Sequence, residues 1–107
     1  MTDTQINGEI AKALGWLFKP MTGPLGRPWE SPEGKRFQNP PSYTTDLNAM
    51  HEAEDYLRKK RKWKSYLDYL VPEDENEIPY NLFWSAAHAT ARQRAEAFLK
   101  TLGLWEE

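Results

Sequence analysis

The feature that most constrains the fold is a helix near the end of the chain whose two ends are both encoded. Thr90 and Gln93 have the spacing of a capping box, in which each side chain accepts a hydrogen bond from the other residue's backbone N–H. The apolar residues that follow recur at spacings of three and four and predict one buried face: Ala91, Ala95, Phe98, Leu99 and Leu102. Gly103 comes next, where a left-handed backbone commonly ends a helix. The pattern predicts an amphipathic helix and specifies no chemistry.

Two further helices are predicted from similar signals. Thr2 and Gln5 form a second capping box, and the helix that follows is expected to stop at Gly15. A central helix is expected to begin with Thr45 or Asp46 as its N-cap. Its apolar face is traced by Leu47, Met50, Ala53, Glu54 and Leu57, and the periodicity extends through Trp63, Leu67 and Leu70. Residues 46–71 therefore form one long helix or two helices, and a break near Lys60 is favoured.

Between the first two helices, residues 17–41 are rich in proline and glycine, so short strands and turns are expected there. Residues 17–19 suit a strand, and residues 29–37 suit a hairpin that turns at Ser31–Gly34. Alternating residues from Tyr80 to Ser85 suit another strand with one buried face. The expected fold is α+β, with a small antiparallel sheet of about three strands sandwiched by three to four helices in a single domain, residues 1–107.

Composition supports a folded domain with a core rich in aromatic side chains. Leucine, isoleucine, valine and phenylalanine are scarce, but the net charge is only −2 and five tryptophans and five tyrosines supply apolar area. We expect Trp16, Trp84 and Trp105 in the core and Trp29 and Trp63 nearer the surface. Because cysteine is absent, disulfides and thiolate metal sites are excluded. No apolar run reaches the length of a membrane span and no signal-peptide pattern is present, so a cytoplasmic protein is expected.

Three segments resemble a known family. IAKALGW (residues 10–16), YTTDLNAMHEAE (residues 43–54) and HATARQRAEAFLKTLGLWEE (residues 88–107) are similar to the phage ABA sandwich domain of small phage and prophage proteins. The resemblance implies an α/β sandwich, a phage or prophage origin and the cytoplasm of a bacterial host, and it brings no catalytic residues. The central basic run and the acidic loop at residues 73–77 depart from the family pattern.

The basic run is the most conspicuous charge feature of the sequence. It consists of Arg58, Lys59, Lys60, Arg61, Lys62 and Lys64, with Trp63 among them. One interpretation is a phosphate-binding patch, with Trp63, Tyr66 and Tyr69 available to stack on bases. The favoured interpretation is a solvated face or a protein-contact surface, because six charges wound on one helix spread around its circumference and the net charge is negative.

Other charged residues support weaker hypotheses. Arg92 and Arg94 lie near the start of the last helix, where cations oppose the helix dipole, so they either hold an anion or pair on the surface, as Arg92 would with Glu96. His51 and Asp55 have the spacing of a helical ion pair, which is favoured over a metal or base site. The sequence contains no nucleophile elbow, phosphate-binding loop or calcium loop. We therefore expect no enzymatic activity, no cofactor and no metal.

The leading hypothesis is a small, non-enzymatic phage or prophage accessory protein that binds a host or phage protein, with anti-defence or host takeover as its sharper form. The surface expected to bind combines Arg58–Lys64 with the acidic loop. One alternative is a small anionic ligand or nucleotide held by aromatic rings and Arg92 and Arg94. A second alternative is nucleic acid bound by the basic run. A monomer and a homodimer are both compatible with the sequence.

Overall fold

The structure is a computed structural model that describes residues 1–20, 26–70 and 89–106. Four helices lie in these ranges: α1 (Asp3–Ala13), α2 (Leu47–Lys59), α3 (Trp63–Leu70) and α5 (Ala91–Thr101). Three strands, β1 (Leu17–Phe18), β2 (Trp29–Glu30) and β3 (Arg36–Phe37), form one antiparallel sheet in the order β1-β2-β3. The expected α+β class with a three-stranded antiparallel sheet is confirmed. The strand expected at residues 80–85 and the acidic loop lie outside the described residues.

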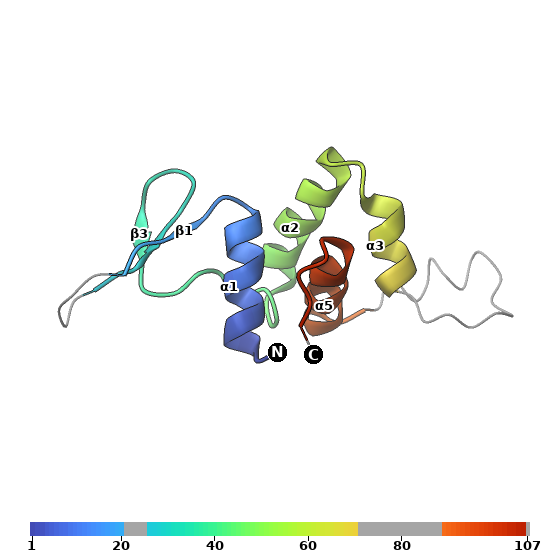
Figure 1. Cartoon of the computed structure of the whole chain (residues 1–107), viewed down its shortest axis with the longest axis horizontal. Coiled ribbons are helices and arrows are strands. Elements are labelled where there is room, and N and C mark those ends of the chain that lie inside the picture. The colour runs from blue at the N-terminus through green and yellow to red at the C-terminus, as the bar shows by residue number, and fades with distance from the viewer. Residues whose placement is uncertain (21–25, 71–88, 107) are drawn as a thin grey trace, which may run out of the picture.

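The helices gather on one side of the sheet (Figure 1). Helix α5 packs against α1, α2 and α3 and so lies at the centre of the helical group, while α1 contacts β1. In the described residues the sheet therefore has helices on one side only. The strands are two residues long and both residues of β1 are exposed, so the sheet offers little apolar surface for helices to cover.

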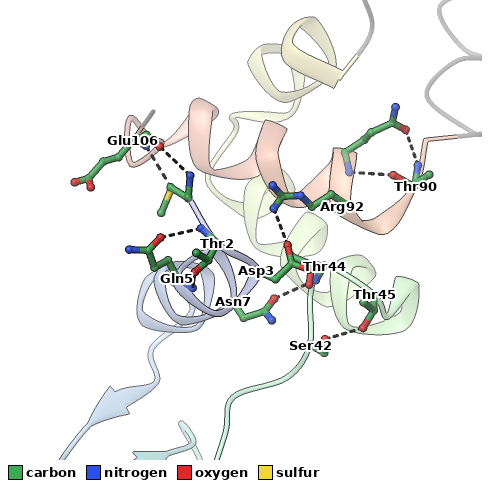
Figure 2. A network of polar contacts seen from close by, with 12 residues as sticks. Thr2, Asp3, Gln5, Asn7, Ser42, Thr44, Thr45, Thr90, Arg92 and Glu106 are labelled. Carbon is green, nitrogen blue, oxygen red and sulfur yellow. Dashed lines mark hydrogen bonds and ion pairs between the residues drawn. The ribbon is translucent and has the colours of Figure 1, made fainter.

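Both terminal helices have the ends that the sequence predicts. In α1 the Thr2 backbone donates to Gln5 Oε1 at 2.8 Å and the Gln5 backbone donates to Thr2 Oγ1 at 3.2 Å. The same two bonds join Thr90 and Gln93 at the start of α5, at 2.8 and 3.1 Å (Figure 2). Both helices end in a left-handed glycine, with φ of 103° at residue 15 and 73° at residue 103. Each end has the pair of reversed backbone bonds of a Schellman motif.

The expected break in the central helix is confirmed. The end of α2 has the same backbone geometry as the ends of α1 and α5, but without a glycine. Helix α2 begins after its N-cap Asp46 and ends at Lys59, and α3 begins at Trp63. Arg61 has a φ of 58°, and its N–H donates to the carbonyl of Arg58 at 3.1 Å. The N–H of residue 62 donates to the carbonyl of residue 57 at 2.9 Å. These are the two bonds of a Schellman motif, with an arginine where glycine is usual.

The sheet contains the expected hairpin and carries a row of aromatic rings, one of which contacts α1. The turn predicted at residues 31–34 is present, with a 2.9 Å bond from the Gly34 N–H to the Ser31 carbonyl. Phe18, Trp29 and Phe37 are partners in register across the three strands and therefore share one face of the sheet. The Trp29 ring lies against residue 8 of α1, whereas Phe18 and Phe37 on the same face are 51% and 40% exposed.

The core consists of helical aliphatic residues and three large rings. Its largest fully buried side chains are Tyr43, Tyr66, Phe98, Ile6, Ile10, Met50, Leu57 and Leu99. The expected core position of Trp16 and Trp105 is wrong, because both are half-buried at the edge of the core. Trp29 and Trp63, expected nearer the surface, are half-buried as well. Trp84 lies outside the described residues. Leu47 was expected on the buried face of the central helix but is 45% exposed, because it opens the first turn of α2 ahead of the packed segment.

Candidate functional site: a basic corner and a buried polar network

The basic run lies at the corner where α2 meets α3, at the top of Figure 1. We use the name basic corner for its six cationic residues, all of which are exposed: Arg58, Lys59, Lys60, Arg61, Lys62 and Lys64. The first two residues close α2, the next three form the connection, and the last lies in the first turn of α3. The argument that six charges spread around the circumference of one helix does not apply, because the favoured break is present and the chain turns at the left-handed residue 61. The turn places the six residues at the junction of the two helices.

Aromatic rings support two cations of the basic corner. The guanidinium carbon of Arg58 lies 4.2 Å from the centre of the Trp63 ring, and Lys60 Nζ lies 5.7 Å from the centre of the Tyr56 ring. Trp63 also contacts Tyr66, with 5.1 Å between the ring centres. Tyr66 is fully buried, so its expected role in stacking on bases is wrong. Tyr69 is 55% exposed.

Three residues of the basic corner lie where local backbone stability favours other residue types. Arg61 has a left-handed backbone, which costs a residue with a side chain about 1–2 kcal/mol. Lys62 lies at the N-cap of α3, where its carbonyl accepts from the Tyr66 N–H at 3.1 Å, but its side chain has no acceptor for the free N–H groups of the first turn. Lys64, in that first turn, opposes the helix dipole. Helix formation therefore does not account for these cations.

The basic corner has little internal neutralisation in the part of the chain that the structure describes. Lys59 Nζ lies 3.6 Å from Asp55 Oδ2, and both side chains are mostly exposed. The other five cationic residues form no ion pair within residues 1–20, 26–70 and 89–106. Within the part of the chain that the structure describes, the basic corner therefore carries five cations without an ion-pair partner, and the Trp63 ring supports one of them, Arg58.

A buried polar network lies directly beneath the basic corner. Glu54, on the packed face of α2, has a side chain that is 4% exposed. Its Oε2 accepts from the Tyr66 hydroxyl at 2.6 Å and from Arg94 Nη1 at 2.7 Å. Arg94 Nε donates to the carbonyl of residue 89 at 3.0 Å. The network joins α2, α3 and α5, and its polar atoms satisfy one another away from water.

Burial and the neighbouring carboxylate both act on the hydroxyl of Tyr66. Removal from water is the larger cause that raises the pKa of Tyr66 above its ordinary value, and the hydrogen bond to Glu54 adds to it. Tyr66 therefore remains a neutral donor across the physiological range. The sequence placed Glu54 on an apolar helix face, and that position was the available signal for this network, because a carboxylate there requires buried partners.

The two arginines at the start of α5 bind carboxylates of two different helices. Arg92 Nη1 lies 3.0 Å from Asp3 Oδ1 of α1 (Figure 2), whereas Arg94 binds Glu54 of α2. The expected pair between Arg92 and Glu96 is wrong, because Glu96 lies 3.3 Å from Lys100. These contacts explain why α5 has cations in its first turn: each arginine ties α5 to a neighbouring helix.

The histidine on α2 takes part in a different pair from the one expected. His51 Nε2 lies 3.9 Å from Glu54 Oε1, while Asp55 pairs with Lys59. The spacing of three brings His51 to Glu54 instead of to Asp55. Within the described ranges, no group of three or more histidine, cysteine, aspartate and glutamate side chains is placed to hold a metal ion.

Comparisons with protein-family models, curated proteins and solved structures find no match for this chain. The resemblance to the phage ABA sandwich domain therefore stays a hypothesis. No helix in the described part of the chain is long and apolar enough to span a membrane.

Proposed function

We propose that this protein is a small, non-enzymatic accessory protein of phage or prophage origin that binds an acidic surface of a host or phage protein through the basic corner. Its site of action would be the cytoplasm of the bacterial host, in an anti-defence or host-takeover role. The observation that carries the proposal is the exposure of cations at three positions, Arg61, Lys62 and Lys64, that favour other residue types locally. Residues kept against local stability are typical of functional surfaces.

The geometry around Arg58 supports a carboxylate as the recognised group. A guanidinium stacked on an indole keeps its N–H groups directed outward in one plane. A planar fork of donors matches the two oxygens of a carboxylate. Because the Trp63 ring restricts Arg58 before a partner arrives, less side-chain freedom is lost on binding. The surrounding lysines add long-range attraction, which raises the rate of encounter with an acidic surface.

Protein is favoured over nucleic acid because two of the three rings expected to stack on bases, Trp63 and Tyr66, are occupied, while Tyr69 is 55% exposed. Trp63 is flanked by Arg58 and Tyr66, and Tyr66 is buried, so neither ring offers an open face for base stacking. The net charge of −2 is also opposite to that of general nucleic-acid binders. A small anion held by Arg92 and Arg94 is less well supported, because both arginines bind carboxylates of this chain.

The proposal is tested by an NMR titration of the whole chain with a capped oligoglutamate peptide. Oligoglutamine of equal length serves as the uncharged control, and oligothymidylate tests nucleic acid. We expect saturable shifts at Arg58 and the Trp63 indole with oligoglutamate, weakened by salt, and no shifts with oligoglutamine.

The matched variant is the double substitution Lys62→Glu and Lys64→Glu. Acidic residues at the start of α3 improve its interaction with the helix dipole, so this variant is expected to be at least as stable as the wild type. We expect it to bind oligoglutamate at least about tenfold more weakly, which corresponds to 1.4 kcal/mol. A control that reverses Arg27 and Lys35, exposed residues outside the helical group, should bind as the wild type does. Binding of oligothymidylate alone, or of neither probe, contradicts the proposal.

A further inference from the structure

A series of side-chain contacts connects the buried network to the exposed guanidinium of Arg58 in the basic corner. The Tyr66 hydroxyl binds Glu54, the Tyr66 ring contacts the Trp63 ring, and the Trp63 ring supports the Arg58 guanidinium. Glu54 and Arg58 are four residues apart on α2 and therefore lie on the same side of that helix. Trp63 and Tyr66 are three residues apart on α3, which gives them the same relationship. The contacts thus fasten the start of α3 to the end of α2 at two points.

The hydroxyl of Tyr66 is the polar anchor of this arrangement. Helix α3 is only eight residues long, so its orientation depends on packing and not on its own stability. The bond from the hydroxyl to Glu54 is 2.6 Å long and charge-assisted, which makes it directional as well as strong. Arg94 holds the same carboxylate oxygen from α5 at 2.7 Å, so the acceptor is itself fixed. Together with the packing of α3 on α5, this bond restricts the rotation of α3 about its axis, and with it the plane of the Trp63 ring.

Resting on the proposed function, we infer that Tyr66 is a positioning residue for recognition and Arg58 is the residue that contacts the partner's carboxylate. Tyr66 acts through Trp63, whose ring holds the Arg58 guanidinium in the plane that a carboxylate requires. The five other cations of the basic corner attract an acidic partner, while Arg58 selects a planar acceptor with two oxygens.

Two substitutions test this inference with oligoglutamate as the probe. Tyr66→Phe keeps the ring and removes the hydroxyl, and Tyr43→Phe is its matched control, since Tyr43 is also buried but lies outside this series of contacts. Arg58→Lys keeps the charge on an exposed side chain and removes the planar fork. We expect Tyr66→Phe and Arg58→Lys each to weaken binding by about three- to tenfold through lost preorganisation and lost bidentate contact. Tyr43→Phe should leave the affinity unchanged.

The side-chain NMR signals separate positioning from stability. The Trp63 indole and the Arg58 Nε–H should move in Tyr66→Phe and stay in place in Tyr43→Phe, in samples that circular dichroism shows to be folded. A purely structural role would lower the unfolding free energy of Tyr66→Phe while the folded protein kept its affinity and both signals, and that result would overturn the inference. If Tyr66→Phe does not fold, Arg58→Lys with wild-type affinity overturns it. In either case wild-type binding that is lost in the Lys62→Glu, Lys64→Glu variant leaves the proposed function standing.

Discussion

Arg94 and Glu54 form a buried ion pair that joins α5 to α2, with 2.7 Å between Nη1 and Oε2 and side chains that are 12% and 4% exposed. Two residues earlier on the same helix, Arg92 pairs with Asp3, but those side chains are 41% and 59% exposed. The two pairs have nearly the same chemistry and differ mainly in burial. Burial decides the energetics, because a buried charge without its partner cannot be rescued by water.

Removing the buried arginine should therefore cost far more stability than removing the exposed one. We expect Arg94→Met to lower the free energy of unfolding by about 3 kcal/mol, since Glu54 would remain as an uncompensated buried charge. Arg92→Met should lower it by less than about 1 kcal/mol, because the exposed pair is screened by solvent. Urea denaturation followed by circular dichroism measures both values. Equal losses in the two variants would show that burial does not decide how much these two pairs stabilise the fold.

Stability should fall as pH rises above about 10, the ordinary pKa of tyrosine. Burial raises the pKa of Tyr43 and is also the main reason for the raised pKa of Tyr66. In the folded protein both side chains thus stay neutral where the unfolded chain ionises. Their contribution is complete below pH 10 and is lost above it, by about 1.4 kcal/mol per pH unit for each tyrosine.

The free energy of unfolding measured from pH 8 to pH 12 tests this dependence. Tyr43→Phe and Tyr66→Phe should each make the decline above pH 10 shallower, because each removes one group that ionises on unfolding. The combined variant should show the shallowest decline of the four proteins. A decline of the same steepness in wild type and combined variant would assign it to groups other than these tyrosines.

The left-handed backbone at Arg61 should be relieved by glycine. We expect Arg61→Gly to raise the free energy of unfolding by about 0.5–1 kcal/mol, because glycine adopts a positive φ without steric cost and this gain exceeds its entropy in the unfolded chain. The opposite exchange at the end of α5, Gly103→Ala, should lower it by about 1 kcal/mol. Thermal unfolding of the two variants beside the wild type gives both signs. A destabilised Arg61→Gly would show that the arginine side chain contributes more than its backbone costs.

The helix ends were predictable because their causes lie within a few residues of one another. A threonine followed three positions later by glutamine satisfies the first N–H groups of a helix wherever the helix packs. The terminal glycines act in the same local way, and the structure has both pairs where the sequence predicts them. The turn at Arg61 has the same backbone geometry but no glycine, so the sequence indicated only a break nearby.

The pairing of charges could not be predicted in this way. Arg94 and Glu54 are 40 residues apart and Arg92 and Asp3 are 89 apart, so only the packing of α5 against its neighbours brings them together. Local spacing instead predicted pairs within one helix, and two of those were wrong because each helix residue can reach several partners with similar energies.

The sequence by itself determined where α1 and α5 begin and end, because their capping bonds close within a single turn of the chain. Tertiary structure decided which cations bind carboxylates of neighbouring helices and which remain on the surface. Arg94 became part of the core and the basic run became a corner, because the fold of α3 onto α2 and α5 buried one set of charges and turned the other outward.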